Sequence, residues 1–180
     1  LSEQHDVTIL STDTAENLSM YDYRQSDVRF EYITYNGKKN LEYLGCKTLS
    51  FLYKKLLPKN NVTSRIYSYS FFRPSYKNSL VVKINNGGYD VVIGVHAFLS
   101  LHLASVRNQL NVRKVIGWMH NCYDALFEKQ NPYLPELKSF FSCGMKRLDN
   151  IVVLSKSDQC LFKENLGLDS VVIYNPLTLE

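Results

Sequence analysis

A chain of 180 residues is long enough for one domain with a substantial core and too short for two full domains. Hydrophobic residues make up 45% and charged residues 21%, which is typical of a globular protein and excludes a disordered one. The net charge is +4, and no dense block of lysines and arginines accompanies it, so no nucleic-acid partner is expected.

The four cysteines are widely scattered and form no CxxC pair. No histidine lies near them at the spacing of metal ligands, so they indicate reduced, mostly buried thiols and no metal site. No apolar run approaches the length of a membrane span, and no signal peptide is visible. We therefore expect a cytoplasmic protein. Because the first residue is Leu1, we also expect the chain to begin inside a longer gene product.

The first quarter of the chain predicts two strands and a helix. Residues 6–11 form a short apolar run typical of a buried strand, and residues 27–34 alternate as a strand with one wetter face does. The pair Asn36–Gly37 then predicts a turn. Over residues 40–57 leucines recur near helical spacing among lysines, which indicates an amphipathic helix that ends at Pro58.

Residues 65–72 alternate like a strand, and a helix over 76–85 follows, closed by Gly87–Gly88. The rest of the chain alternates strands with helices. The predicted strands are 90–95, 114–119, 150–155 and 170–175, and the predicted helices are 98–110, 135–148 and 157–166. The helix over 135–148 has Pro135 and Glu136 in its first turn, where both are favoured.

This order predicts βαβ units and therefore a mainly parallel sheet with helices on both faces, a Rossmann-like, doubly wound α/β fold. The strands after residue 90 are short, rich in Val and Ile and almost uninterrupted, as strands buried on both faces are. We expect one domain over residues 1–176, with residues 177–180 starting a linker to a further domain.

Ligands of open parallel sheets bind beyond the carboxyl ends of the strands. Two of the four histidines, His96 and His120, follow neighbouring predicted strands at matching positions, where an imidazole can donate a hydrogen bond or act as a base. Asn121, Tyr123 and Asp124 cluster with His120. A purely structural role remains the alternative. In every α/β domain the chain turns in contact with water at the strand ends, so polar residues are common there.

Ser155 lies at the end of a predicted strand and is most simply the N-cap of the next helix, a position compatible with binding an anion. Several standard motifs are missing. Without a G-x-G-x-x-G or P-loop motif, neither type of nucleotide site is supported, and without G-x-S-x-G neither is a hydrolase nucleophile.

Three segments together resemble the amino-terminal domain of retaining GT-B glycosyltransferases, in particular those of family 4. They are DVVIGVHAF, KVIGWMHNCYD and LDNIVVLSKSDQCLFKENLGLDSVVIYNPL, which span residues 90–177 in the order and spacing of that family. HDVTIL, near the start, is similar to the family's second strand. Residues 20–85 match nothing in the family, as expected for its variable acceptor region.

The resemblance implies a domain that binds the acceptor, a saccharide or a lipid-linked molecule, in polysaccharide or glycoconjugate biosynthesis. The nucleotide-sugar donor is a co-substrate bound mainly by a carboxyl-terminal GT-B domain, and neither a metal ion nor another cofactor is implied. His120 matches the cleft histidine that contacts the transferred sugar, so it is the candidate catalytic residue. His96, Asn121, Tyr123, Asp124 and Ser155 are candidates for the acceptor side of the cleft.

The family's first strand with its glycine-rich loop, and its Glu-x7-Glu motif, do not appear in the 180 residues. We therefore expect a sheet without its first strand and no turnover by this chain alone. One alternative is a non-catalytic GT-B-like partner or chaperone subunit of an active transferase, and a second is a GT-B epimerase. The lysines of the helix over 40–57 add an expectation of docking on an anionic membrane surface, at the inner face of the membrane, against the alternative of a core-facing helix.

Overall fold

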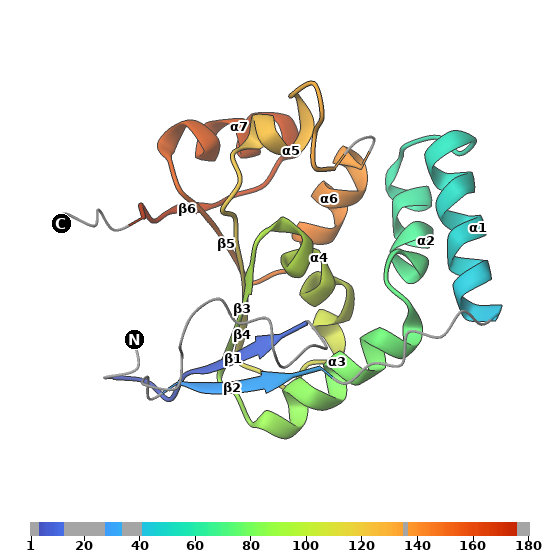
Figure 1. Cartoon of the computed structure of the whole chain (residues 1–180). Coiled ribbons are helices and arrows are strands. Elements are labelled where there is room, and N and C mark those ends of the chain that lie inside the picture. The colour runs from blue at the N-terminus through green and yellow to red at the C-terminus, as the bar shows by residue number, and fades with distance from the viewer. Residues whose placement is uncertain (1–3, 13–27, 34–40, 135–136, 176–180) are drawn as a thin grey trace.

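The computed structural model describes residues 4–12, 28–33, 41–134 and 137–175 (Figure 1). Its strands are β1 (Thr8–Ser11), β2 (Arg29–Tyr32), β3 (Val91–Val95), β4 (Lys114–Trp118), β5 (Asn150–Val153) and β6 (Val171–Val172). Its helices are α1 (Leu41–Lys55), α2 (Asn61–Phe71), α3 (Pro74–Gly87), α4 (Ala97–Val106), α5 (Tyr123–Phe127), α6 (Lys138–Met145) and α7 (Lys156–Leu166), with a short 3₁₀ turn, η2 (Arg107–Gln109).

All strand pairs are parallel and form two sheets. β1 pairs with β2, and the larger sheet has the order β3-β4-β5-β6. Gly94 of β3 lies opposite Gly117 of β4, which lies opposite Ile151 of β5. Helices flank these strands, so the expected Rossmann-like α/β class is confirmed.

One face of the four-stranded sheet carries the core. Val92, Val115 and Ile151 lie on this face and belong to the hydrophobic clusters that the helices complete. The three crossovers from β3 to β6 step in one direction, and right-handed crossovers then place their helices on the same side. The opposite face of β3 carries valine and isoleucine side chains that are 36% to 49% exposed. Among the described residues, burial on both faces is therefore not seen at β3.

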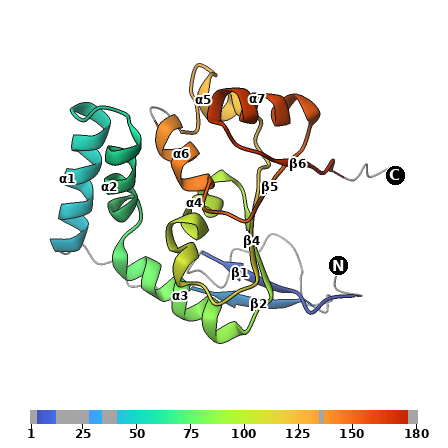
Figure 2. The ribbon, with the colours of Figure 1, turned by 180° about the vertical axis from the view of Figure 1, so that it is seen from behind.

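The helical hairpin of α1 and α2 packs against α6, away from β1 and β2 in both views (Figures 1 and 2). Tyr67 of α2 stacks on Tyr53 of α1 with ring centroids 4.2 Å apart, and its edge meets Phe140 of α6 at 5.0 Å. The Tyr53 and Ser64 hydroxyls are also hydrogen-bonded at 2.9 Å. Aromatic packing thus ties the hairpin to the core.

The strand predicted over residues 65–72 is wrong, because these residues belong to helix α2. Asn60 caps the helix by accepting from the backbone of Thr63, whose side chain in turn accepts from the backbone of Asn60. Buried Ser64, Tyr67 and Ser68 recur every three or four residues, which is the period of a helix. Pro74 does not break a strand but begins the next helix, α3.

Other boundaries differ less. The helix predicted over 98–110 is α4 followed by η2, and the helix predicted to reach 148 ends at Met145. The polar loop after β4 contains the unpredicted short helix α5. The predicted turn at Asn36–Gly37, the helix start at Pro135 and Glu136, and the linker at 177–180 lie outside the described residues.

α1 buries only Tyr53, whereas Leu41, Leu44, Phe51 and Leu56 are 60% to 86% exposed. The alternative of a core-facing helix therefore holds for only part of α1, where Tyr53 is buried and Leu49 and Leu52 are half-buried. Among the described residues no helix is long and apolar enough to cross a membrane.

The cysteines are also less buried than predicted. Cys122 and Cys160 are exposed, and Cys46 and Cys143 are half-buried.

Candidate functional site

The carboxyl ends of β3, β4 and β5 lie side by side. Val95 pairs with Trp118, and Trp118 pairs with Val152, so the residues that follow these strands emerge from one edge of the sheet. This edge is where ligands of open parallel sheets bind. It contains His96, His120 and Ser155, as the sequence predicts.

His96 has φ 81° and ψ 149°, and it is the one non-glycine residue with positive φ in the described part of the chain. Such a conformation is nearly restricted to glycine and costs of order 1–3 kcal/mol. Three hydrogen bonds hold it. The His96 N–H donates to the Trp118 carbonyl at 2.9 Å, and the His96 carbonyl accepts from Ser100 N at 3.0 Å and from Ser100 Oγ at 2.9 Å.

The strain at His96 follows from how closely α4 approaches the sheet. The one proton of the Ser100 hydroxyl is shared between the His96 carbonyl and the Gly94 carbonyl, which lies 2.8 Å from Ser100 Oγ. A Cβ built on Gly94 would come within 2.9 Å of the Ser100 backbone. A Cβ on Gly117 would meet Met145 at 2.9 Å. The two glycines let α4 and α6 pack on the strands, and the chain must turn sharply at His96 to enter α4.

His96 also caps α4, where its Nδ1 faces the Phe98 N–H at 3.4 Å. Its ring meets the ring of Tyr133 edge-on, with centroids 6.2 Å apart. Tyr133 is 64% exposed, and it was not predicted from the sequence. In the sequence Tyr133 lies in a polar loop that contains two prolines, and this position does not indicate that its ring lies beside His96.

His120 is exposed and stacks on Trp118, with ring centroids 5.7 Å apart. Two side-chain polar atoms beside it, Trp118 Nε1 and Asn121 Oδ1, are buried without a hydrogen-bond partner among the described residues. Buried polar atoms without partners are uncommon and call for an explanation such as a ligand. The donor and the acceptor could both serve a hydroxyl-rich molecule.

Tyr123 is 2% exposed, so its ring does not line the edge. Its hydroxyl donates to Glu128 Oε1 at 2.9 Å, and burial raises the pKa of its phenol. Its backbone N–H donates to Asp158 Oδ1 at 2.9 Å. Tyr123 therefore supports the loop after β4 from inside. Asp124, its neighbour, has an exposed side chain.

Ser155 is the N-cap of α7, as predicted, and accepts from the Asp158 N–H at 3.0 Å. Its hydroxyl donates to Asp158 Oδ2 at 2.7 Å. A carboxylate thus already lies at the start of α7, and it opposes the binding of a further anion there. The main role of Ser155 is therefore to cap the helix. Its hydroxyl can donate to a ligand only if its hydrogen bond to Asp158 breaks.

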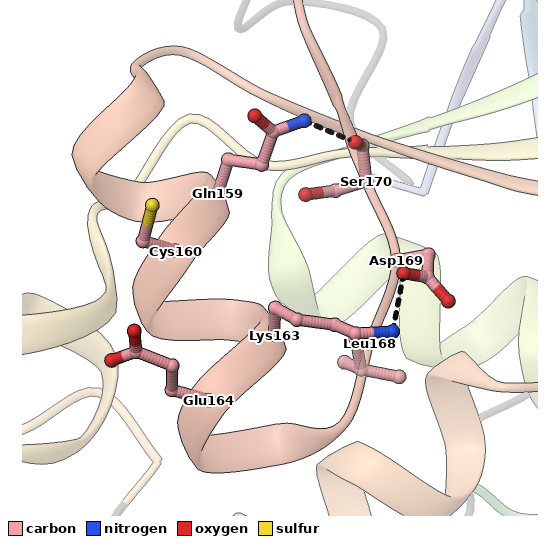
Figure 3. A pocket seen from close by; sticks show the side chains of 7 residues that line it. All are labelled: Gln159, Cys160, Lys163, Glu164, Leu168, Asp169 and Ser170. Atoms are coloured by element: carbon pink, nitrogen blue, oxygen red, sulfur yellow. Dashed lines mark hydrogen bonds and ion pairs between the residues drawn. The ribbon is translucent and has the colours of Figure 1, made fainter.

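A further hollow lies elsewhere. It has a volume of about 300 Å³ and is open, and its residues come from α7 and the segment leading to β6 (Figure 3). Its polar groups are joined to one another, since Gln159 Nε2 donates to the Ser170 carbonyl at 2.6 Å and Lys163 pairs with Asp169 at 2.6 Å. Its lining residues belong to α7 and to the segment before β6, so the strand ends that carry the histidines lie outside it.

No group of three potential metal ligands occurs in the described part of the chain. No protein-family model, curated protein or solved structure matches the sequence or the fold of this chain.

Proposed function

We propose that this chain is the acceptor-binding half of a glycosyltransferase that moves a sugar from a nucleotide-sugar donor to a saccharide or lipid-linked acceptor. The observation that supports it most is the edge formed by His96, Trp118, His120 and Asn121. It combines a strained backbone, an exposed stacked imidazole and two buried polar atoms without partners. The resemblance of residues 90–177 to retaining GT-B enzymes of family 4 supplies the reaction class.

In this proposal His120 is the catalytic residue and hydrogen-bonds the transferred sugar. His96 and Asn121 bind acceptor hydroxyls, and the exposed ring of Tyr133 beside His96 offers a face on which a sugar ring stacks. Asp124 and Ser155 remain acceptor-side candidates at the rim. Tyr123 holds the loop in place and has no direct contact with the acceptor.

The donor is bound mainly by a second, carboxyl-terminal GT-B domain, so the isolated 180 residues are expected to show no turnover. A non-catalytic partner or chaperone subunit of an active transferase is the competing proposal. The two differ in the residues beyond Glu180, because only an active transferase needs the Glu-x7-Glu motif there.

The test is a comparison of His120→Ala with His5→Ala in the complete polypeptide, assayed with a panel of nucleotide sugars and saccharide acceptors. His5 is exposed and lies just before β1, which makes it a matched control. Loss of one positioned group in the transition state lowers kcat/KM by roughly 100-fold or more. We expect that loss for His120→Ala and wild-type activity for His5→Ala. Equal activity of the two variants would remove His120 from the mechanism, and no turnover by the wild type would favour the non-catalytic partner.

Where the acceptor of this proposal is lipid-linked, α1 is the element that docks on the membrane. Its outer side exposes Leu41, Leu44 and Phe51 together with Lys47, Lys54 and Lys55. Apolar side chains flanked by lysines suit the interface of an anionic bilayer. The protein is then cytoplasmic and peripheral at the inner face of the membrane.

A further inference from the structure

Trp118, the last residue of β4, contacts both candidate histidines of the site. Its carbonyl accepts a hydrogen bond from the His96 N–H at 2.9 Å. Its indole ring stacks on the imidazole of His120, with an angle of 25° between the two ring planes. Trp118 thus connects the strained turn into α4 with the exposed imidazole.

The indole lies on the face of the sheet opposite the helices. Val115 packs in the core that the helices cover, and side chains alternate along a strand, so Trp118 points to the other face. Val95, the in-register neighbour of Trp118 on β3, is 49% exposed there. The ring that stacks on the indole belongs to His120, which is itself exposed. A ligand that displaces this one surface side chain therefore approaches the indole without opening the core.

Two polar atoms of opposite kind flank His120. Trp118 Nε1 carries a proton and can only donate, whereas Asn121 Oδ1 can only accept. Both atoms are buried, and neither has a hydrogen-bond partner among the described residues. A buried polar atom without a partner destabilises the free protein. A ligand that supplies both partners therefore gains affinity from both atoms.

This donor and acceptor distinguish between classes of ligand. A carboxylate or a phosphate satisfies the indole N–H, but its negative oxygens face the lone pairs of Asn121 Oδ1. An ammonium group satisfies Asn121 Oδ1, but its protons face the indole N–H. A hydroxyl both donates and accepts, so the hydroxyls of a neutral sugar serve both atoms. The net charge of +4 favours anionic ligands, so a preference for a neutral sugar would have to come from this local pair.

We propose that Trp118 and Asn121 determine the specificity of this site, and that they select a neutral sugar ring over the same ring with a carboxylate. The inference rests on the proposed function in taking the ligand to be a saccharide. The indole N–H donates to a hydroxyl oxygen of the sugar, and Asn121 Oδ1 accepts a proton from a hydroxyl. The Trp118 ring keeps the imidazole of His120 beside these hydroxyls.

Binding of free sugars to the 180-residue chain tests the proposal without turnover. Trp118 is the one tryptophan of the chain, so its indole N–H gives a single signal in a proton–nitrogen correlation spectrum. The probes are glucose and galactose, each paired with its uronate, which carries a carboxylate in place of the hydroxymethyl group. We expect a neutral sugar to shift the indole signal and to bind about tenfold more tightly than its uronate, which is the order of one hydrogen bond.

Tighter binding of the uronates would overturn the proposal, and so would an indole signal that none of the sugars moves. The proposed function can fail separately. If the complete polypeptide bound the neutral sugar through Trp118 but transferred nothing, the glycosyltransferase would be refuted and the specificity of the site would stand.

Two variants separate the donor from the acceptor, with binding followed by the backbone amide signals of residues 119–121. Trp118→Phe keeps a ring for His120 to stack on but has no N–H, so we expect it to weaken binding of both the neutral sugar and the uronate. Asn121→Leu removes the acceptor that opposes the carboxylate. We expect it to weaken binding of the neutral sugar about tenfold and to abolish the preference over the uronate.

Tyr89→Phe is the matched control. It removes a polar aromatic proton at the opposite end of β3, from a half-buried ring, and should leave both affinities unchanged. Equal weakening by Tyr89→Phe would indicate a general loss of structure and not a lost contact. A preference for the neutral sugar that survives in Asn121→Leu would contradict the assigned role of Asn121, because a residue with a merely structural role does not change the ratio of the two affinities.

Discussion

At the scale of single residues, the backbone of His96 is the feature on which the proposed site depends most. A side chain in a region of φ and ψ suited to glycine destabilises the fold, and such strain is found mostly where a side chain is needed. Glycine at this position would keep the turn into α4 without the strain. The presence of histidine is therefore consistent with selection for the imidazole and not for stability.

Two substitutions at His96 separate strain from contact. Both His96→Gly and His96→Ala remove the imidazole, but only alanine keeps a Cβ in the strained conformation. We expect the free energy of unfolding of His96→Gly to exceed that of His96→Ala by about 1–3 kcal/mol, measured by urea denaturation. Equal stabilities would show that the turn relaxes without strain.

His102, one turn after Phe98 on α4, is half-buried among aromatic rings, and its buried Nδ1 has no hydrogen bond among the described residues. Burial, and then the nearby charge of Lys77, lower its pKa from 6.5 to about 3. The unfolded chain takes up the proton of His102 at a higher pH than the folded protein does. The contribution of the neutral imidazole to the free energy of unfolding is therefore fully present above pH 6.5. It is lost as the pH falls toward 3.

The pH dependence can be isolated with His102→Phe, which keeps an aromatic ring at this position. A full difference of one proton corresponds to about 1.4 kcal/mol per pH unit. We expect wild type to lose more stability than His102→Phe between pH 7.5 and 5, by roughly 2 kcal/mol. His5→Phe, at an exposed position, should retain the wild-type dependence. If His102→Phe retained it as well, the imidazole would have to be solvated in the folded state.

At the scale of elements, α4 determines the geometry of the site because it approaches the sheet through glycines. Gly94→Ala places a Cβ 2.9 Å from the Ser100 backbone, a contact that a flexible side chain cannot relieve. We expect a loss of about 1–3 kcal/mol in unfolding free energy, as for overpacked cores. Gly45→Ala in α1 is the matched control, since nothing lies within 4 Å of its Cβ and a helix interior gains about 0.5–1 kcal/mol from alanine. A stable Gly94→Ala protein would mean that α4 can move away from β3.

Element boundaries were predictable where local chemistry alone decides them. α7 starts at its Ser155 cap and ends at Gly167, whose φ is 62°, as the sequence indicates. The sequence of α2 predicts a strand because alternating Ser, Tyr and Phe residues suit a strand as well as a helix, although the capping box at Asn60 and Thr63 marks the start of a helix. For the site, the histidines could be placed after strands. The strain at His96 and its neighbour Tyr133 could not be predicted, because both depend on packing between distant segments.

At the scale of the whole molecule, the apolar and basic outer side of α1 is the surface through which we expect the protein to bind a membrane. We expect salt-sensitive co-sedimentation with vesicles containing phosphatidylserine. Replacing Lys47, Lys54 and Lys55 by glutamine should weaken it by roughly 100-fold, at about 1 kcal/mol per lysine near the surface.

The control carries the same change of charge elsewhere, at Lys114, Lys129 and Lys156, all exposed and outside α1. Equal weakening by both triple variants would indicate attraction by net charge alone. The absence of vesicle binding by wild type would remove the membrane from the proposed function.

Apart from its packing on α2, helix α1 meets the rest of the molecule at few places. α1 buries one side chain, Tyr53, and its Glu42 accepts hydrogen bonds from Ser75 at the start of α3. Everything else on the outer side of α1 can be altered without repacking the sheet. The fold thus divides into a part whose sequence is constrained by its core and a part that is free to vary, and over evolution a new partner can be acquired by changing α1 alone.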